Sequence, residues 1–208
     1  MKHMDSVNKT HAQNINNAFK VVFKTLESVE NLINCCISKF DQEQYHLPTE
    51  RFLRFSSDRT WQGWIYWSFI LIFQRTEDGP LEKNNWINGP LYAVEIDLDA
   101  EVNENAPQLL IAKMEYDDIG EWPEGLSPSE HGKFYDPIHE EKYFEGKDLE
   151  DGLRCVVPKR SCEDTVKRSY KNLRRTIVKR LPLVEITEEN YLDEIFGGIE
   201  QLAKLPLK

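Results

Sequence analysis

The sequence predicts a single α+β domain over residues 11–205, built on an antiparallel meander of at least three strands. A long N-terminal helix and two C-terminal helices should pack on that sheet. Three observations support this fold class. Residues 91–99 alternate apolar and polar side chains, as a strand with one buried face does. Residues 61–74 form the most apolar segment, rich in aromatic and β-branched side chains. Residues 11–40 carry apolar side chains at helical spacing.

The N-terminal helix should begin near Thr10, which forms a capping box with Gln13. Its apolar positions are separated alternately by four and three residues. They are Ile15, Phe19, Val22, Leu26, Val29, Ile33, Cys36 and Phe40. Further apolar residues widen this stripe, which favours a helix packed in the core over a homodimerisation helix, although a homodimer through this helix stays the alternative. Residues 1–10 should be disordered, and the opening Met-Lys-His-Met is consistent with a partial cloning remnant.

The sheet should consist of consecutive strands joined by turns. Both faces of residues 61–74 are apolar, which predicts a central strand covered on both sides. Turn signals then precede the alternating strand 91–99, and a polar loop leads into a further strand over 108–116. These segments form the predicted meander.

The C-terminal half is predicted with different elements. Residues 117–151 are acidic but contain several aromatic side chains, which indicates a long ordered loop. A short strand should follow at 153–157. Helical apolar spacing then predicts a helix over 161–181, ended by Pro182, and a last helix capped by Thr187.

Composition places the chain among soluble globular proteins. It has 208 residues, of which 40% are hydrophobic and 30% charged. The longest apolar run, 64–73, is too short for a membrane helix, which needs roughly 20 residues. The N-terminus lacks the pattern of a secretory signal, so we expect a cytoplasmic protein with reduced cysteines.

Charge is segregated along the chain, whose net charge is −10. Residues 95–151 hold 18 acidic against 4 basic side chains, whereas residues 159–180 hold 9 basic against 2 acidic ones. The two regions either neutralise each other in the fold or expose a basic surface to an anionic partner.

The first candidate site is the polar face of strand 91–99, which presents Glu95, Asp97 and Asp99. Carboxylates of this kind hold Mg²⁺ or Mn²⁺ beside a phosphate, and Lys113 across the hairpin would stabilise phosphoryl charge. The arrangement resembles nucleases that pair acids with a lysine on adjacent strands. Those enzymes place an acid two residues before the lysine, where this chain has Ile111. An ordinary solvated strand face is the favoured interpretation.

The second candidate is the basic flank of the helix predicted over 161–181. Its cations would bind a partner or the phosphates of a nucleic acid. The main ones are Lys167, Arg168, Lys171, Arg174 and Arg175. A charged face that is solvated or paired internally is the favoured alternative.

For two further clusters, an ordinary structural role is favoured over a functional one. The loop holds a histidine and acid cluster whose spacing matches no established metal motif. It consists of Glu130, His131, Asp136, His139, Glu140 and Glu141. An aromatic cluster resembles a stacking platform for a base or sugar, but core packing is favoured for so apolar a strand. It consists of Trp61, Trp64, Tyr66 and Trp67.

The sequence contains no phosphate-binding glycine loop, dinucleotide fingerprint, nucleophile elbow or kinase signature. The leading hypothesis is therefore a non-catalytic macromolecular interaction module, with another protein as its partner and nucleic acid as the alternative partner. The second hypothesis is a metal-dependent nuclease or phosphoesterase that uses the acidic strand face and the basic helix. A cofactor, Mg²⁺ or Mn²⁺, is expected under the second hypothesis alone.

Overall fold

The computed structural model describes residues 2–38, 44–49, 51–60, 63–82, 84–98 and 106–206. The chain forms two compact units, Met1–Phe40 and Asp41–Lys208. The second unit, called the body below, contains the sheet and the remaining helices. The single domain expected over residues 11–205 has no boundary near residue 40, whereas the chain divides into the two units there.

An antiparallel sheet forms the centre of the body and confirms the predicted α+β class. Among the described residues its spatial order is β1-β2-β3-β4-β7-β6-β5. The strands are β1 (Tyr45–His46), β2 (Ser68–Arg75), β3 (Leu91–Asp97), β4 (Gln108–Tyr116), β5 (Phe144–Asp148), β6 (Leu153–Pro158) and β7 (Leu173–Pro182). The expected meander is confirmed as β2, β3 and β4, which pair with one another in sequence order.

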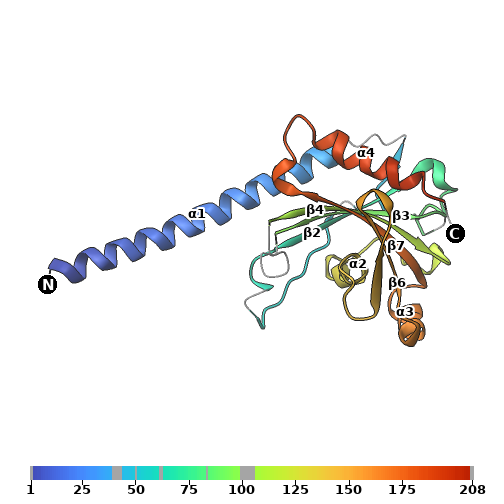
Figure 1. Ribbon diagram of the computed structural model, residues 1–208, viewed down its shortest axis with the longest axis horizontal. Helices are drawn as coiled ribbons and strands as arrows, with labels where there is room; N and C mark the ends of the chain where they lie inside the picture. Colours follow the sequence, from blue (N-terminus) through green and yellow to red (C-terminus); the bar gives the residue numbers. More distant parts are fainter. Residues whose placement is uncertain are drawn as a thin grey trace. The chain divides into compact units, whose positions relative to one another are not determined.

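The two faces of the sheet are covered by different helices, as Figure 1 shows. Helix α4 (Tyr191–Ala203) lies on one face, where a Cβ atom added to Gly198 would approach Ile111 Cδ1 to 2.4 Å. Helix α2 (Gly132–Ile138) lies on the other face, where Phe134 and Ile138 join the core beside Ala93. Strands β2, β3 and β4 are buried on both sides, as expected for β2, but the strand predicted over 61–74 begins only at Ser68, and Trp64 and Ile65 before it are exposed.

The first unit contains one long helix, α1 (Lys2–Ser38). It begins before the capping box expected at Thr10 and includes residues that we expected to be disordered. Ile15, Phe19 and Phe23 are more than half exposed on it, with exposed fractions of 59%, 54% and 65%. Phe40, the last position of the predicted stripe, lies outside the described residues. No described helix has the length and apolar character that crossing a membrane requires.

The helix expected over 161–181 is wrong in its second half. Residues 163–169 form the short helix α3 (Glu163–Ser169), but residues 173–182 form strand β7 between β4 and β6. Lys171 and Asn172 adopt φ angles of 54° and 56°, which end the helix. The β-branched run of Thr176, Ile177 and Val178 then pairs with both neighbouring strands, so tertiary pairing overrides the helical spacing.

The acidic segment 117–151 is ordered, as predicted, but it is more than a loop. It contains the 3₁₀ turn η4 (Pro128–His131), helix α2 and strand β5. Ser127 and Glu130 form a capping box at the start of η4, which fixes the direction in which the chain enters α2. This segment therefore covers one face of the sheet with a short helical layer.

Candidate functional site

A buried polar cluster interrupts the apolar sheet face that α2 covers. Its members come from β2, β3, η4 and the residue that follows α2. They are Ser68, Glu95, Asp97, His131 and His139. The side chains of Glu95 and Asp97 have no exposure to solvent, and that of His139 is 3% exposed. Buried ionisable groups gathered in this way mark a candidate functional site.

Local structure explains why these side chains meet. Glu95 and Asp97 are two residues apart on β3 and therefore share a face, and Ser68 pairs directly with Asp97 across the sheet. His131, Tyr135 and His139 are spaced by four residues, so the helical turns of η4 and α2 bring them onto one side. Their rings stack, with centroid distances of 5.2 Å from His131 to Tyr135 and 4.1 Å from Tyr135 to His139.

Ser68 links Glu95 to His131 by two short hydrogen bonds. Its Oγ donates to Glu95 Oε1 over 2.5 Å and lies 2.7 Å from His131 Nε2. A serine hydroxyl has one proton, so the hydroxyl that donates to Glu95 must accept from His131. This assignment places a proton on His131 Nε2, and it makes Ser68 a group that orients the carboxylate.

Burial determines the protonation state of His131. It lowers the pKa of that imidazole to about 4, and the charge of Glu95 opposes the shift. His131 is therefore neutral near pH 7, in agreement with the hydrogen bond that it donates to Ser68.

His139 behaves in the opposite way. Burial alone would lower its pKa, but the hydrogen bond to Glu95 and the charges of Glu95 and Asp97 outweigh burial and raise the pKa. The two histidines, although stacked on the same tyrosine, thus differ because one faces carboxylates and the other faces a hydroxyl.

The ligand atoms of Glu95, Asp97 and His139 all lie within 4.8 Å of one another. His139 Nε2 is 3.0 Å from Glu95 Oε2 and 3.9 Å from Asp97 Oδ2. Two ligands that each sit about 2.1 Å from an ion can be separated by up to about 4.2 Å, so these two distances suit a shared ion. Two carboxylates and one imidazole can therefore hold a divalent metal with small side-chain rotations.

The cation that lies beside this cluster is Arg180, not the expected Lys113. Leu110 on β4 pairs with Glu95 on one side and with Arg180 on the other, so both side chains project from the same sheet face. Arg180 also donates to the carbonyl oxygen of Ile138 over 3.2 Å, next to His139. Its charge opposes the raised pKa of His139.

Lys113, which we expected beside the acids, is directed to the opposite sheet face. It pairs with Tyr92, which is three residues before Glu95 on β3, so the side chains of Tyr92 and Glu95 point to opposite faces of the sheet. Its ammonium group donates to the carbonyl oxygen of Leu205 over 2.8 Å and lies 3.6 Å from Glu115. Burial lowers the pKa of Lys113. Asp99, the third predicted acid, lies outside the described residues.

The five predicted basic residues do not share one helix face. Lys167 and Arg168 occupy the last turn of α3, and Lys171 lies in the turn after it. Arg174 and Arg175 lie on β7 and therefore point to opposite faces of the sheet. The structure thus does not bring these cations together as the predicted helix would have done.

The loop cluster of acids and histidines divides into separate roles. His131 and His139 join the buried site, which the sequence analysis did not favour because it treated 117–151 as a loop. Asp136 instead accepts from Lys142 and from the hydroxyl of Tyr170. Glu130 belongs to the capping box. The four-residue spacing of His131, Tyr135 and His139 was the signal available in the sequence.

Comparisons of the chain with protein-family models, with curated proteins and with solved structures find no match.

Proposed function

We propose that the body binds a divalent metal ion through Glu95, Asp97 and His139 and uses it to hydrolyse a phosphoester. One observation carries this proposal: the ligand atoms of two fully buried carboxylates and a histidine all lie within 4.8 Å of one another. Burying charged groups costs several kcal/mol per ion, and hydrophobic side chains of similar size would fill the same space without that cost. Binding a metal ion would account for the burial of these charged groups despite that cost.

The donor set favours a transition metal. Carboxylate oxygens suit Mg²⁺, Ca²⁺ and Mn²⁺, whereas an imidazole nitrogen suits transition metals such as Fe²⁺ and Zn²⁺. Ser68 and His131 would act around the ligands, because they fix the orientation of the Glu95 carboxylate. Of the ions considered from the sequence, Mn²⁺ fits this set better than Mg²⁺.

Phosphoester hydrolysis suits the charges around the cluster. A bound divalent ion lowers the pKa of a coordinated water and so supplies hydroxide near neutral pH. Arg180, which lies beside His139, would stabilise the negative charge that develops on a transferred phosphoryl group. In this proposal Arg180 has the role that the sequence analysis gave to Lys113.

The test is hydrolysis of bis(p-nitrophenyl) phosphate with and without Mn²⁺. We expect activity that requires Mn²⁺ and falls more than about 100-fold in Asp97→Asn, because the variant loses a charged ligand. Asp117→Asn is the matched control, since that carboxylate is 62% exposed and pairs with Arg174 outside the cluster. Equal activity with and without metal, or equal activity of both variants, would contradict the proposal.

A second function, that of an interaction module, is favoured by the exposed apolar side chains of α1. The exposed residues Ile15 and Phe19 belong to a seam that alternates spacings of four and three, which is the pattern of helices that pair with an identical copy. We therefore infer that α1 supports a homodimer. Light scattering of the full chain should give twice the monomer mass of 24.4 kDa.

The seam can be tested by one variant and one control on the same helix. Phe19→Glu places a charge in the seam and should shift the protein to monomer, whereas Lys20→Glu lies one residue away and should leave the dimer intact. A monomeric wild-type chain would exclude the homodimer.

A further inference from the structure

Large apolar side chains are exposed at the entrance to β2, immediately before Ser68. Trp64 is 69% exposed, Ile65 48% and Phe55 40%. Together with Trp67 these residues are called the Trp64 patch. Trp64 and Trp67 belong to the aromatic cluster for which the sequence analysis favoured core packing, and Trp61 of that cluster lies outside the described residues. A large exposed tryptophan beside other apolar groups is a common mark of a binding surface.

Backbone contacts hold the Trp64 patch in place. Leu53 and Ile70 exchange hydrogen bonds of 2.8 and 3.0 Å, which fixes residues 51–55 against β2. The amide of Ser57 donates to the carbonyl of Gly63 over 3.3 Å. A Cβ atom at Gly63 would lie 2.2 Å from the Ser57 nitrogen, so only glycine permits this close approach. The chain therefore folds back just before Trp64.

A continuous series of rings joins the Trp64 patch to the candidate metal ligands. Phe55 lies 6.2 Å from Trp67, and Trp67 meets Tyr135 edge to face at 5.3 Å. Tyr135 in turn stacks on His139 at 4.1 Å. Trp67 of the patch is thus connected through Tyr135 to His139 of the buried cluster.

Cations accompany the exposed rings. Residues 51–60 contain Arg51, Arg54 and Arg59 against a single acid, Asp58. The guanidinium of Arg54 lies over the ring of Tyr66 at 4.9 Å, while Arg51 and Arg59 are exposed. Aromatic rings interleaved with arginines provide stacking surfaces for bases together with positive charge for phosphates.

We propose that the Trp64 patch binds the unpaired bases of single-stranded nucleic acid, which would be the substrate of the neighbouring metal centre. The substrate role rests on the proposed function, whereas the binding of bases does not. A stacked base would cover Trp64, and the phosphates on either side would face Arg51 and Arg59. The net charge of −10 opposes general attraction to nucleic acid, so binding must come from these local contacts.

The patch suits this ligand better than an apolar protein partner. Residues 51–60 carry three arginines against one acid, so their net positive charge favours a phosphate-bearing ligand over an uncharged partner. An aromatic surface stacks on the faces of bases. These faces are accessible in a single strand but are covered by neighbouring base pairs in a duplex, so the patch should prefer single strands.

The test is the binding of a fluorescein-labelled 12-nucleotide oligothymidylate to the full chain in EDTA, followed by fluorescence anisotropy. Without metal there is no cleavage, so binding is measured apart from the proposed hydrolysis. We expect the single strand to bind at least 10-fold more tightly than a duplex of the same length. Trp64→Ala should weaken binding by about 10-fold or more, since base stacking on an aromatic ring contributes about 1–3 kcal/mol. Trp64→Phe should retain most of the affinity.

Two further variants separate stacking from charge and from general apolar exposure. Val184→Ala removes another exposed apolar side chain, 74% exposed and outside the patch, and should leave binding unchanged. Arg59→Ala should lower the slope of log affinity against log salt by about 0.7, the value expected for one lost contact to a single-strand phosphate.

Two outcomes would overturn the inference. The first is the absence of oligonucleotide binding, which would leave a protein partner as the occupant of the patch. The second is binding that Trp64→Ala does not weaken. Failure of the proposed function gives a different result: the wild type would bind the oligonucleotide in a Trp64-dependent way but show no Mn²⁺-dependent cleavage.

Discussion

Glu95 is a carboxylate with no solvent exposure, and each of its oxygens is hydrogen-bonded. Ser68 donates to one oxygen, and His139 lies 3.0 Å from the other. Hydrogen bonds of this kind offset part of the cost of removing a charge from water. The same contacts fix the orientation of the carboxylate, which is what a metal ligand requires.

At the residue scale, the sequence revealed the acids but not their partners. The strict alternation of residues 91–99 placed Glu95 and Asp97 on one strand face. Ser68 and His139 are 27 and 44 residues away from Glu95 along the chain. Contacts over such separations depend on the packing of β2 and α2 against β3, which periodicity within one segment does not contain.

His131 should make the stability of the protein depend on pH. Its pKa falls from 6.5 to about 4 on folding, so the unfolded chain takes up a proton between these pH values and the folded chain does not. The contribution of His131 is therefore unchanged above about pH 6.5 and is lost progressively as the pH falls toward 4. The total loss is about 3 kcal/mol.

His131→Gln tests this pH dependence, because the glutamine amide can still donate to Ser68 but does not titrate. Urea unfolding at pH 7 and at pH 4 gives the free energy of unfolding at each pH. The decrease from pH 7 to pH 4 should be about 3 kcal/mol smaller in the variant. An equal decrease in both proteins would show that His131 is not held neutral by burial.

At the element scale, β7 shows where sequence prediction stops. The apolar residues of 166–181 fit a helical period, yet Leu173, Ile177 and Val178 are buried on a strand. Helical spacing over a short window also accommodates a strand whose faces are both covered. By contrast, the meander and the presence of an N-terminal helix were predicted correctly, because each has a long, regular pattern within a short stretch of sequence. The start of α1 was wrong, since the helix begins at Lys2.

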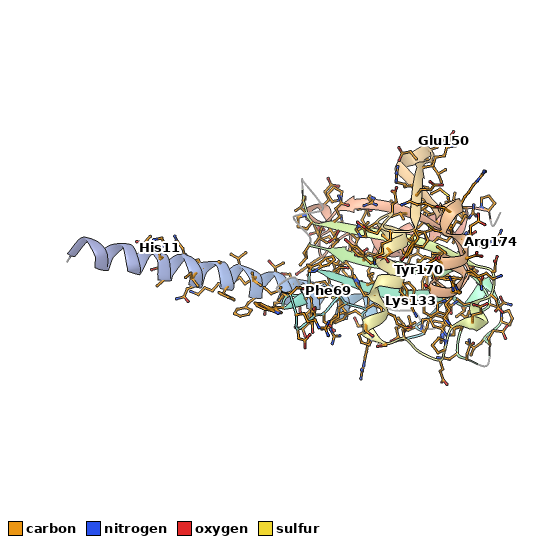
Figure 2. The ribbon with its side chains drawn as sticks, turned by 90° about the horizontal axis from the view of Figure 1, so that it is seen from below. His11, Phe69, Lys133, Glu150, Tyr170 and Arg174 are labelled. Atoms are coloured by element: carbon orange, nitrogen blue, oxygen red, sulfur yellow. The ribbon has the colours of Figure 1, made fainter. Side chains whose placement is uncertain are left out.

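Because β7 is a strand, its two adjacent arginines have different environments and should contribute differently to the stability of the protein. Arg175 forms two hydrogen bonds, of 2.6 and 2.8 Å, with Glu115, whose side chain is 5% exposed. Arg174 is 50% exposed and pairs with Asp117 at 3.4 Å. Figure 2 shows Arg174 at the outer edge of the body.

Arg175→Ala should destabilise the protein by about 3 kcal/mol, because it leaves the buried Glu115 carboxylate without its main partner. Arg174→Ala, the matched control one residue away, should change stability by less than about 1 kcal/mol. The free energy of unfolding in urea provides the measurement. Equal effects of the two substitutions would contradict the assignment of these residues to opposite faces of a strand.

At the scale of the whole molecule, the segregated charges meet in the fold. The acidic region contributes Glu115 and Asp117, and the basic region contributes their partners Arg175 and Arg174. Arg154, which lies between the two regions in sequence, pairs with Glu140. These pairs favour internal neutralisation over a continuous basic surface.

The central claim is that the body binds one metal ion. Strand β3 and the 117–151 segment would supply the ligands, and β7 would supply the neighbouring Arg180. Anomalous diffraction from crystals grown with Mn²⁺ tests it most directly. We expect a peak bonded to Glu95, Asp97 and His139 at about 2.0–2.3 Å, absent in Asp97→Asn crystals. Crystals without a peak at this position, in which His139 remains hydrogen-bonded to Glu95, would contradict it.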